Sequence, residues 1–294
     1  MKKLLGAWNK DFDPYGVYDP NVNDHIKQVV PEFNVTESPP DSYDARTANP
    51  KCTVISTVRD QSSCGSCWAF SATESFESSR CVQKGEDVQF STMDTAGCCR
   101  GLFCGLSMGC GGGQQGSALN WMTRTGVVTG GDYDSNSGCK PYEFAPCAHH
   151  VDPTPKYPAC PSSEYSTTCK KECESSYTTK SYDNDKTKGS DAFSLRSVSE
   201  MQSAIMQYGP LAVSFSVYSD FPTYKSGVYK HTSGSMLGGH AVLMVGWGTD
   251  PTGGDYWIIK NSWNEEWGDG GFFKIARGTD ECGIESDVSG IKFE

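Results

Sequence analysis

The sequence predicts an α+β fold of two lobes, in which helices and disulfide-stapled loops come first and an antiparallel sheet follows. Helical spacing and clustered cysteines fill the first half of the chain, whereas alternating apolar residues typical of strands fill the last third. With 294 residues, the chain is long enough for one large or two medium domains with sizeable cores. A cleft between two such lobes is a common place for a functional site.

The first lobe is expected to be helical and heavily cross-linked. Residues 67–81 carry apolar side chains at helical intervals with few breakers, and a short helix at 120–125 would end at Gly126. Residues 97–113 are rich in glycine and cysteine, which predicts a stapled loop. Residues 130–190 hold few apolar residues and five cysteines, so long loops held by disulfides are expected there.

The second lobe is expected to be a sheet preceded by one helix. Ser197 and Glu200 form a capping-box pattern that predicts the start of this helix, and Gly209-Pro210 predicts its end. The apolar stretches that follow predict strands at 211–218, 240–247, 256–260 and 271–276.

Composition and charge exclude several classes of protein. The net charge of −11 argues against a nucleic-acid binder, and no apolar run approaches the roughly 20 residues of a membrane span. Fourteen irregularly spaced cysteines favour disulfides over zinc, and hence a secreted or endomembrane protein. Asn34 begins a possible glycosylation sequon. No signal peptide is recognisable, so we expect that the natural N-terminus lies upstream of Met1.

The stretch QSSCGSCWAF holds Cys64 and Cys67, which could be a redox pair, half of a metal site, or a structural thiol beside a reactive one. A thioredoxin-like site needs a short βαβ unit around it, and a zinc site needs a second ligand pair at regular spacing. Neither pattern is visible. A helix that begins at Cys67 would stabilise a thiolate there through its dipole, which favours the third interpretation.

A reactive thiol also needs a base, and His240 is the candidate. His240 begins one predicted strand and Asn261 ends the next, so antiparallel pairing would bring them together. A lone buried histidine is more often a packed core residue. The preceding Gly238-Gly239 and the Asn-Ser-Trp at 261–263, which could orient and cover the ring, favour a catalytic role instead.

Three blocks, QSSCGSCWAF, GGHAVLMVGWG and NSWNEEWGDGGFFKI, resemble the active-site blocks of papain-like cysteine proteases, from about Ser42 to the C-terminus. The resemblance implies a papain-like two-lobe fold. Its helical lobe would lie mainly at 52–130, its antiparallel β-barrel-like lobe mainly at 190–290, and the active cleft between them. It also implies a role for each site residue: Cys67 as nucleophile, His240 as base and then acid, Asn261 as its orienting partner, Trp263 as a shield, and Gln61 as an oxyanion donor.

The stretch PCAHHVDPTPKYPAC resembles the occluding loop of the cathepsin B subfamily, here residues 147–160. By that resemblance, His149 and His150 bind the C-terminal carboxylate of a substrate, which adds dipeptidyl carboxypeptidase to endopeptidase activity at acidic pH. The resemblance also ties His149 to Asp60, and it pairs Lys156 with Glu266.

Two further positions of the subfamily concern substrate recognition. Asp287 corresponds to the acid at the bottom of the pocket for the second residue before the cleaved bond, although a plain surface Asp is an equally good interpretation. Gly112 and Gly113 would line the cleft where an extended substrate needs bare backbone. Ser62 stands where the family has glycine, and Gly111 where it has Asn.

The family pattern implies six disulfides and leaves Cys282 as a free thiol besides Cys67. The expected pairs are Cys52–Cys81, Cys64–Cys110, Cys98–Cys169, Cys99–Cys104, Cys139–Cys173 and Cys147–Cys160.

Residues 1–38 resemble the end of an inhibitory propeptide that crosses the cleft, which leaves 39–294 as the peptidase domain. The resemblance further implies peptide and protein substrates, inhibition by the propeptide and by cystatin-like proteins, and a monomer without metal or organic cofactor. Two alternatives are a catalytically silent binding protein and a thiol oxidoreductase that uses Cys64 and Cys67.

Overall fold

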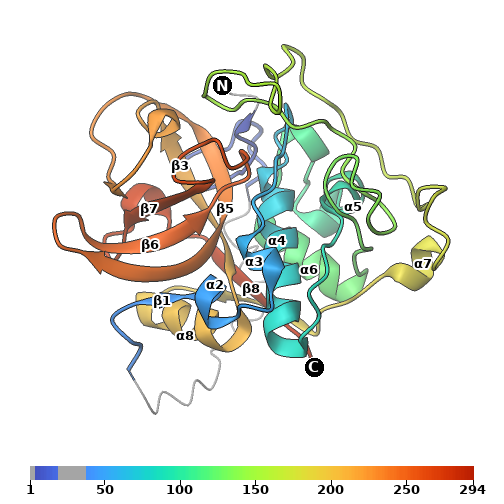
Figure 1. Cartoon of the computed structure of the whole chain (residues 1–294), viewed down its shortest axis with the longest axis horizontal. Helices are drawn as coiled ribbons and strands as arrows, with labels where there is room; N and C mark the ends of the chain where they lie inside the picture. The colour runs from blue at the N-terminus through green and yellow to red at the C-terminus, as the bar shows by residue number, and fades with distance from the viewer. Residues whose placement is uncertain (1–3, 19–37) are drawn as a thin grey trace.

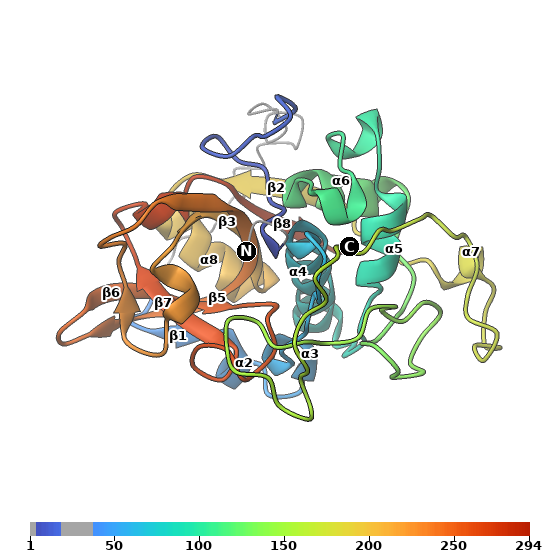
Figure 2. The same cartoon turned by 90° about the horizontal axis from the view of Figure 1, so that it is seen from above.

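The computed structural model describes residues 4–18 and 38–294, and it forms two lobes (Figure 1). The strands gather on one side and the helices α4, α5 and α6 on the other, with the blue N-terminal segment between them when seen from above (Figure 2). We call residues 4–18 the leader segment. The predicted two-lobe α+β fold is confirmed.

The helical lobe is built around α4 (Cys67–Lys84), which is buried along most of its length. It ends at Gly85, whose φ of 73° lies in the left-handed region that favours glycine. Helix α6 packs against it and begins earlier than expected. The other helices are α2 (Ala45–Ala48), α3 (Thr53–Ser56), α5 (Thr92–Cys98), α6 (Gln115–Arg124) and α7 (Tyr182–Asp185), with short 3-10 turns η2 (Leu102–Cys104) and η3 (Gly109–Gly111).

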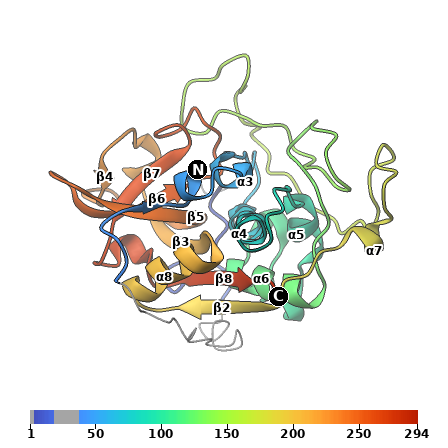
Figure 3. The same cartoon turned by 60° about the horizontal axis from the view of Figure 1, so that its bottom comes forward.

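The second lobe carries an eight-stranded sheet with α8 (Val198–Tyr208) against it (Figure 3). The predicted capping box at Ser197 and Glu200 begins α8. The strands lie in the order β2-β8-β3-β5-β6-β7-β4, with β1 also paired to β5. They are β1 (Tyr43–Asp44), β2 (Asp191–Leu195), β3 (Leu211–Tyr218), β4 (Val228–Tyr229), β5 (Met236–Asp250), β6 (Gly254–Lys260), β7 (Phe272–Ala276) and β8 (Val288–Lys292).

The sheet differs from the expected barrel-like arrangement in two ways. It is open, because β2 and β4 end the strand order without pairing to each other within the described part of the chain. One pair, β4 with β7, is parallel rather than antiparallel. The antiparallel pairing of β5 with β6 places Leu243 opposite Lys260, and this register decides where the site residues at the strand ends meet.

A buried ionic cluster joins the two lobes behind α4. Lys260 Nζ lies 3.4 Å from Glu74 Oε2, and Arg59 Nη1 lies 3.7 Å from Glu77 Oε2. Both acids belong to α4, whereas Lys260 ends β6 and Arg59 precedes Asp60 in the chain. Buried charges persist only when paired and hydrogen-bonded, so these pairs hold two loop segments in fixed positions on the helix.

Six disulfides join Cys52–Cys81, Cys64–Cys110, Cys98–Cys169, Cys99–Cys104, Cys139–Cys173 and Cys147–Cys160, the same pairs as the family pattern implies. Cys67 and Cys282 are free. None of the helices within residues 4–18 and 38–294 has the length and apolar character needed to span a bilayer. Asn34 lies outside the described residues.

Candidate active site

Cys67 is the first residue of α4 and is fully buried between the lobes. The helix N-terminus favours negative charge on its sulfur. The disulfide from Cys64 to Cys110 fixes the approach to the helix. Gly65 lies between the two cysteines, where a Cβ atom would stand 2.3 Å from the carbonyl oxygen of Cys110. A glycine is therefore required at this close crossing of two backbones.

His240 and Asn261 meet as their strands predict. His240 Nε2 lies 2.7 Å from Asn261 Oδ1, which also accepts the Ser262 backbone N–H at 2.9 Å. Because Oδ1 can only accept, His240 must carry its proton on Nε2 in the neutral form. Nδ1 has no hydrogen-bond partner among the described residues and is free to take a proton. The asparagine thus selects the tautomer in which the ring can act as a base.

Trp263 covers this histidine. Its ring stacks on His240 with centroids 4.7 Å apart and 25° between the planes, and the side chain is fully buried. The same indole contacts the rings of His150 at 4.9 Å and His149 at 6.3 Å. Trp263 therefore keeps water from the His240–Asn261 bond and forms a common wall between this pair and the two loop histidines.

Gln61 is held in one orientation beside Cys67. Its Oε1 accepts from the Ser262 hydroxyl at 2.8 Å, so the Nε2 end must point the other way. Nε2 donates to the carbonyl oxygens of Cys64 at 2.8 Å and of Leu4 at 2.9 Å. The Leu4 carbonyl oxygen of the leader segment therefore occupies the position to which Gln61 Nε2 can donate a hydrogen bond.

The leader segment runs through the space between the lobes and bonds to both. Gly113 N–H donates to Gly6 O at 2.8 Å, and Trp8 N–H donates to Gly113 O at 3.1 Å. On the other side, Ala7 N–H donates to Gly239 O at 3.1 Å. Gly6 N–H approaches Cys67 Sγ at 3.4 Å. These contacts define a cleft that binds extended backbone directly over the thiol.

The family model described as "Papain family cysteine protease" matches residues 39–291, which include the thiol, the imidazole and the asparagine just described. The chain belongs to the papain family of cysteine proteases. The protease is 47% identical to the cathepsin B-like cysteine proteinase 6 of Caenorhabditis elegans over 255 residues. The matched part is 85% of this chain and 66% of that protein, so the chain spans just under two thirds of that relative. It is 42% identical to a cathepsin B-like cysteine proteinase of Schistosoma japonicum over 97% of this chain and 80% of that one.

Solved structures of proforms share the fold. Procathepsin B of Trypanosoma congolense matches with a TM-score of 0.75 and 29% identity, over 100% of this chain and 87% of that one. Procathepsin L 3 of Tenebrio molitor matches with a TM-score of 0.65 and 24% identity, over 91% and 75% of the two chains. The latter likeness concerns the fold alone.

In the leader-covered cleft, burial disfavours the charged forms of both Cys67 and His240. Burial raises the pKa of the Cys67 thiol, although nearby backbone N–H groups oppose the rise. Burial also lowers the pKa of His240 to about 4, against the hydrogen bond to Asn261. Both shifts disfavour a thiolate–imidazolium pair. Burial in the covered cleft therefore opposes the ion pair that the family's chemistry needs.

The loop at 147–160 is anchored through Asp60. His149 Nε2 lies 2.8 Å from Asp60 Oδ1, and Asn264 Nδ2 donates to Asp60 Oδ2 at 2.8 Å. Cys147, His149 and Cys160 cluster closely enough to suggest a metal site. Both sulfurs belong to a disulfide, so they offer no thiolate ligands.

The predicted pairing of Lys156 with Glu266 is wrong. Lys156 Nζ binds Glu265 instead, as does the Tyr157 hydroxyl. Glu266 accepts from the Thr154 hydroxyl at 3.2 Å. Adjacent side chains point in different directions after Asn264, whose φ of 54° turns the backbone, so the two acids reach different parts of the loop.

Asp287 lies at the start of β8 and is buried. Its Oδ2 accepts from Gln115 Nε2 at 2.8 Å and from the Ser214 hydroxyl at 2.9 Å. Two uncharged donors thus hold the carboxylate in place. Gly112 lines the cleft as expected, since a Cβ there would stand 2.5 Å from the Trp8 indole nitrogen of the leader segment.

Two residues of the site were not foreseen from the sequence. Ser262 orients Gln61 and also donates its N–H to Asn261. Asn264 links Asp60 to the loop by donating to Cys147 O at 2.8 Å. The only available signal was that both flank Trp263 and carry polar side chains in an otherwise buried segment.

Ser62, at the position where the family has glycine, adopts a φ of 56° in the left-handed region. Its N–H donates to Asp60 Oδ1 and its hydroxyl to Ala145 O, both at 2.6 Å. Ser62→Ala would lose the hydroxyl bond and keep the strain, whereas Ser62→Gly would lose the bond and relieve the strain. We expect the alanine variant to be less stable than the glycine variant by about 1–2 kcal/mol in urea unfolding. Equal stability of the two variants would contradict this account.

Proposed function

We propose that the protease, once its leader segment has left the cleft, cleaves peptide bonds within chains and also releases dipeptides from free C-termini, most effectively at acidic pH. Cys67 Sγ attacks the carbonyl carbon, and Gln61 Nε2 with the Cys67 N–H stabilises the oxyanion. His240 first holds the thiol proton and then gives it to the leaving amine. Water finally hydrolyses the acyl-enzyme, with His240 as the base.

The observation that supports dipeptide release is the position of the two loop histidines. His149 is tied to Asp60, and both imidazole rings lie against Trp263, which also covers His240. A C-terminal carboxylate bound by these rings would therefore lie a short distance from the reacting thiol. A free peptide end, rather than any side chain, would then decide where the bond is cut.

The pH dependence follows from His150. Burial, together with the electrostatic effect of the neighbouring His149, lowers its pKa to about 4. A bound carboxylate favours the protonated ring and therefore raises the pKa of His150. Between pH 4 and the pKa of His150 in the complex, binding of the substrate is accompanied by uptake of a proton. KM for substrates with a free C-terminus should therefore fall as the pH falls toward 4.

His149→Ala with His150→Ala is expected to reduce dipeptide release by about tenfold to a hundredfold, because a charge-assisted contact to the carboxylate is lost. Hydrolysis of a C-terminally blocked substrate should stay within about threefold, since such a substrate offers no free carboxylate to the two histidines. Both substrates would be assayed across acidic to neutral pH. An equal loss on the two substrates would rule out a carboxylate-binding role.

We further propose that Asp287 lets the pocket for the second residue before the cleaved bond accept arginine. Asp287→Asn retains the shape and removes the charge. It should lower kcat/KM by about tenfold for a substrate with arginine there, and leave a leucine substrate unchanged. If both substrates respond alike, Asp287 has only a structural role.

The remaining proposals concern biological context. Residues 1–38 act as the end of an inhibitory propeptide of the peptidase domain 39–294, and the enzyme works as a monomer in a lysosome, vacuole or secreted fluid. Six disulfides support an oxidising compartment. Inhibition by cystatin-like proteins can be tested by titration of the leader-free enzyme.

A further inference from the structure

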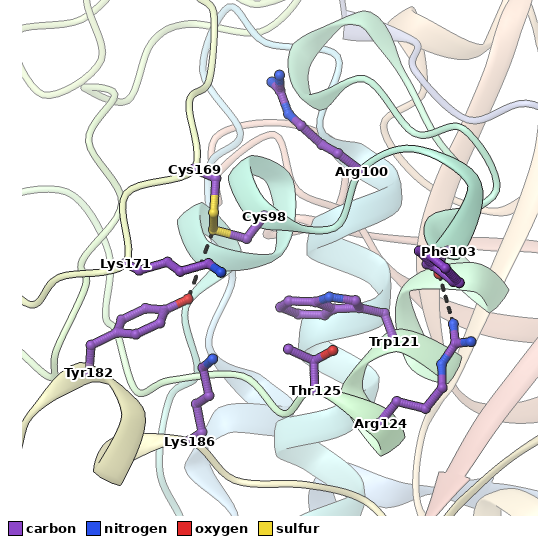
Figure 4. Close-up of a pocket in the computed structure, with 10 residues that line it drawn as sticks. All are labelled: Cys98, Arg100, Phe103, Trp121, Arg124, Thr125, Cys169, Lys171, Tyr182 and Lys186. Atoms are coloured by element: carbon purple, nitrogen blue, oxygen red, sulfur yellow. Dashed lines mark hydrogen bonds between the residues drawn. A yellow bond between two sulfur atoms is a disulfide. The ribbon is translucent and has the colours of Figure 1, made fainter.

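A cavity lies in the helical lobe beside the Trp121 ring (Figure 4). Its volume is about 450 Å³, which is within the range of small-molecule sites. Helix α6, the turn η2, the segment around Cys169 and helix α7 contribute its walls. None of its lining residues makes a recorded contact with the leader segment, so the cavity is separate from the substrate cleft within the described residues.

Four basic side chains surround the cavity: Arg100, Arg124, Lys171 and Lys186. In Figure 4 they come from different sides of a central ring, that of Trp121. The chain as a whole carries a net charge of −11. A local group of four cations opposes this overall charge and favours the approach of an anion to the cavity.

The cations are poorly neutralised by the protein. Arg100 donates to the backbone oxygen of Thr167 at 2.5 Å, and Arg124 donates to that of Phe103 at 2.7 Å. Lys186 lies 3.5 Å from Asp183, whose carboxylate side chain is 87% exposed. Within residues 4–18 and 38–294, no ion pair is recorded for Arg100, Arg124 or Lys171. An anion entering the cavity would therefore meet charges that are still available.

Apolar surface fills the space between the cations. Trp121 is 7% exposed, and its indole N–H has no recorded acceptor in the described part of the chain. Tyr182 closes another side, and its hydroxyl donates to Asp94, an acid already paired with Lys140. The disulfide between Cys98 and Cys169 completes the wall. A ring would pack on these groups, and an acceptor atom at its edge would satisfy the indole donor.

We propose that this cavity binds a small organic anion that carries at least two sulfate or phosphate ester groups on a ring-containing body. Such groups offer several acceptor oxygens to arginine and lysine. An anion with two ester groups can contact cations from different sides of the Trp121 ring at once, whereas a single inorganic ion offers only one such group. Sulfated sugars and nucleotide phosphates share the required chemistry, and the experiment separates them.

The test is isothermal titration calorimetry on the full chain at constant ionic strength and neutral pH. The probes are a fully sulfated disaccharide, a nucleoside bisphosphate, inorganic sulfate and an oligoglutamate of equal charge. The variant is Lys171→Glu with Lys186→Glu. The matched control is Lys225→Glu with Lys230→Glu, which changes the net charge equally at exposed positions of the other lobe. Circular dichroism checks that each variant is folded.

We expect either the sulfated disaccharide or the nucleoside bisphosphate to bind saturably, at least about tenfold more tightly than inorganic sulfate. The ester that does so shows whether the ligand is a sulfated sugar or a nucleotide. The Lys171/Lys186 variant should weaken that binding by about a hundredfold, and the control by no more than about threefold. Three results would overturn the proposal: no saturable binding of either ester, equal weakening by the control, or tighter binding of the oligoglutamate.

Discussion

Cys67→Ser is expected to abolish peptide hydrolysis by the leader-cleaved enzyme, with kcat lowered by at least about 10⁴-fold. A serine hydroxyl at this site has a far higher pKa than a thiol, so His240 cannot generate the nucleophile as readily. The rest of the cleft would remain intact, because a serine hydroxyl can accept from the same backbone N–H groups, such as that of Gly6, that approach the thiol. Substrate binding should therefore persist while turnover is lost.

The second free cysteine supplies the matched control. Cys282 lies in the turn before β8, and burial together with Glu281 raises the pKa of its thiol to about 12. Such a thiol is a poor nucleophile at neutral pH. Cys282→Ser should retain activity within about threefold. Retained activity in Cys67→Ser, or comparable loss in Cys282→Ser, would contradict the assigned mechanism.

Gly6→Ala is expected to weaken inhibition by the leader segment by about a hundredfold, because two or three backbone hydrogen bonds would be displaced. A Cβ atom on Gly6 would stand 1.9 Å from the Gly65 carbonyl oxygen, which belongs to rigid backbone. The measurement is the inhibition constant of synthetic peptides covering residues 1–18 against the leader-cleaved enzyme.

A second glycine of the leader segment gives the control for that experiment. A Cβ on Gly16 would meet no atom within 4 Å, although its φ of 65° carries a left-handed penalty. Gly16→Ala should thus weaken inhibition by no more than about tenfold, because only the strain of placing one alanine in the left-handed region is added. If the two peptides inhibit equally, the leader segment does not occupy the cleft as described.

Much of the fold was predictable because a few local rules dominate. The alternating residues of β3 gave its bounds, and the capping box gave the start of α8. The short strands were missed because they lack such signals. In β8, for example, Gly290 interrupts the pattern, yet a Cβ there would stand 2.4 Å from the Phe193 ring, so tight packing requires it.

Candidate catalytic residues could be proposed from the sequence because their chemistry is specified by residue type. The residues that hold them and the neighbouring loop in place could not be proposed in this way, because their contacts depend on the direction in which each side chain points. The turn at Asn264 sends Glu265 to Lys156 and Glu266 to Thr154, and no spacing rule distinguishes the two acids. The basic cavity was equally hidden, since its four cations come from segments far apart in the chain.

The central claim is that Cys67 is a nucleophile held neutral by the leader segment. Peptide mapping after alkylation with a thiol-reactive epoxide tests it most directly, in the full chain and after leader cleavage. Removing the leader segment uncovers Cys67 and His240, so the thiol can ionise and react. We expect the label on Cys67 alone, at least about a hundredfold faster after cleavage. Equal labelling rates before and after cleavage, or a label mainly on Cys282, would contradict the account.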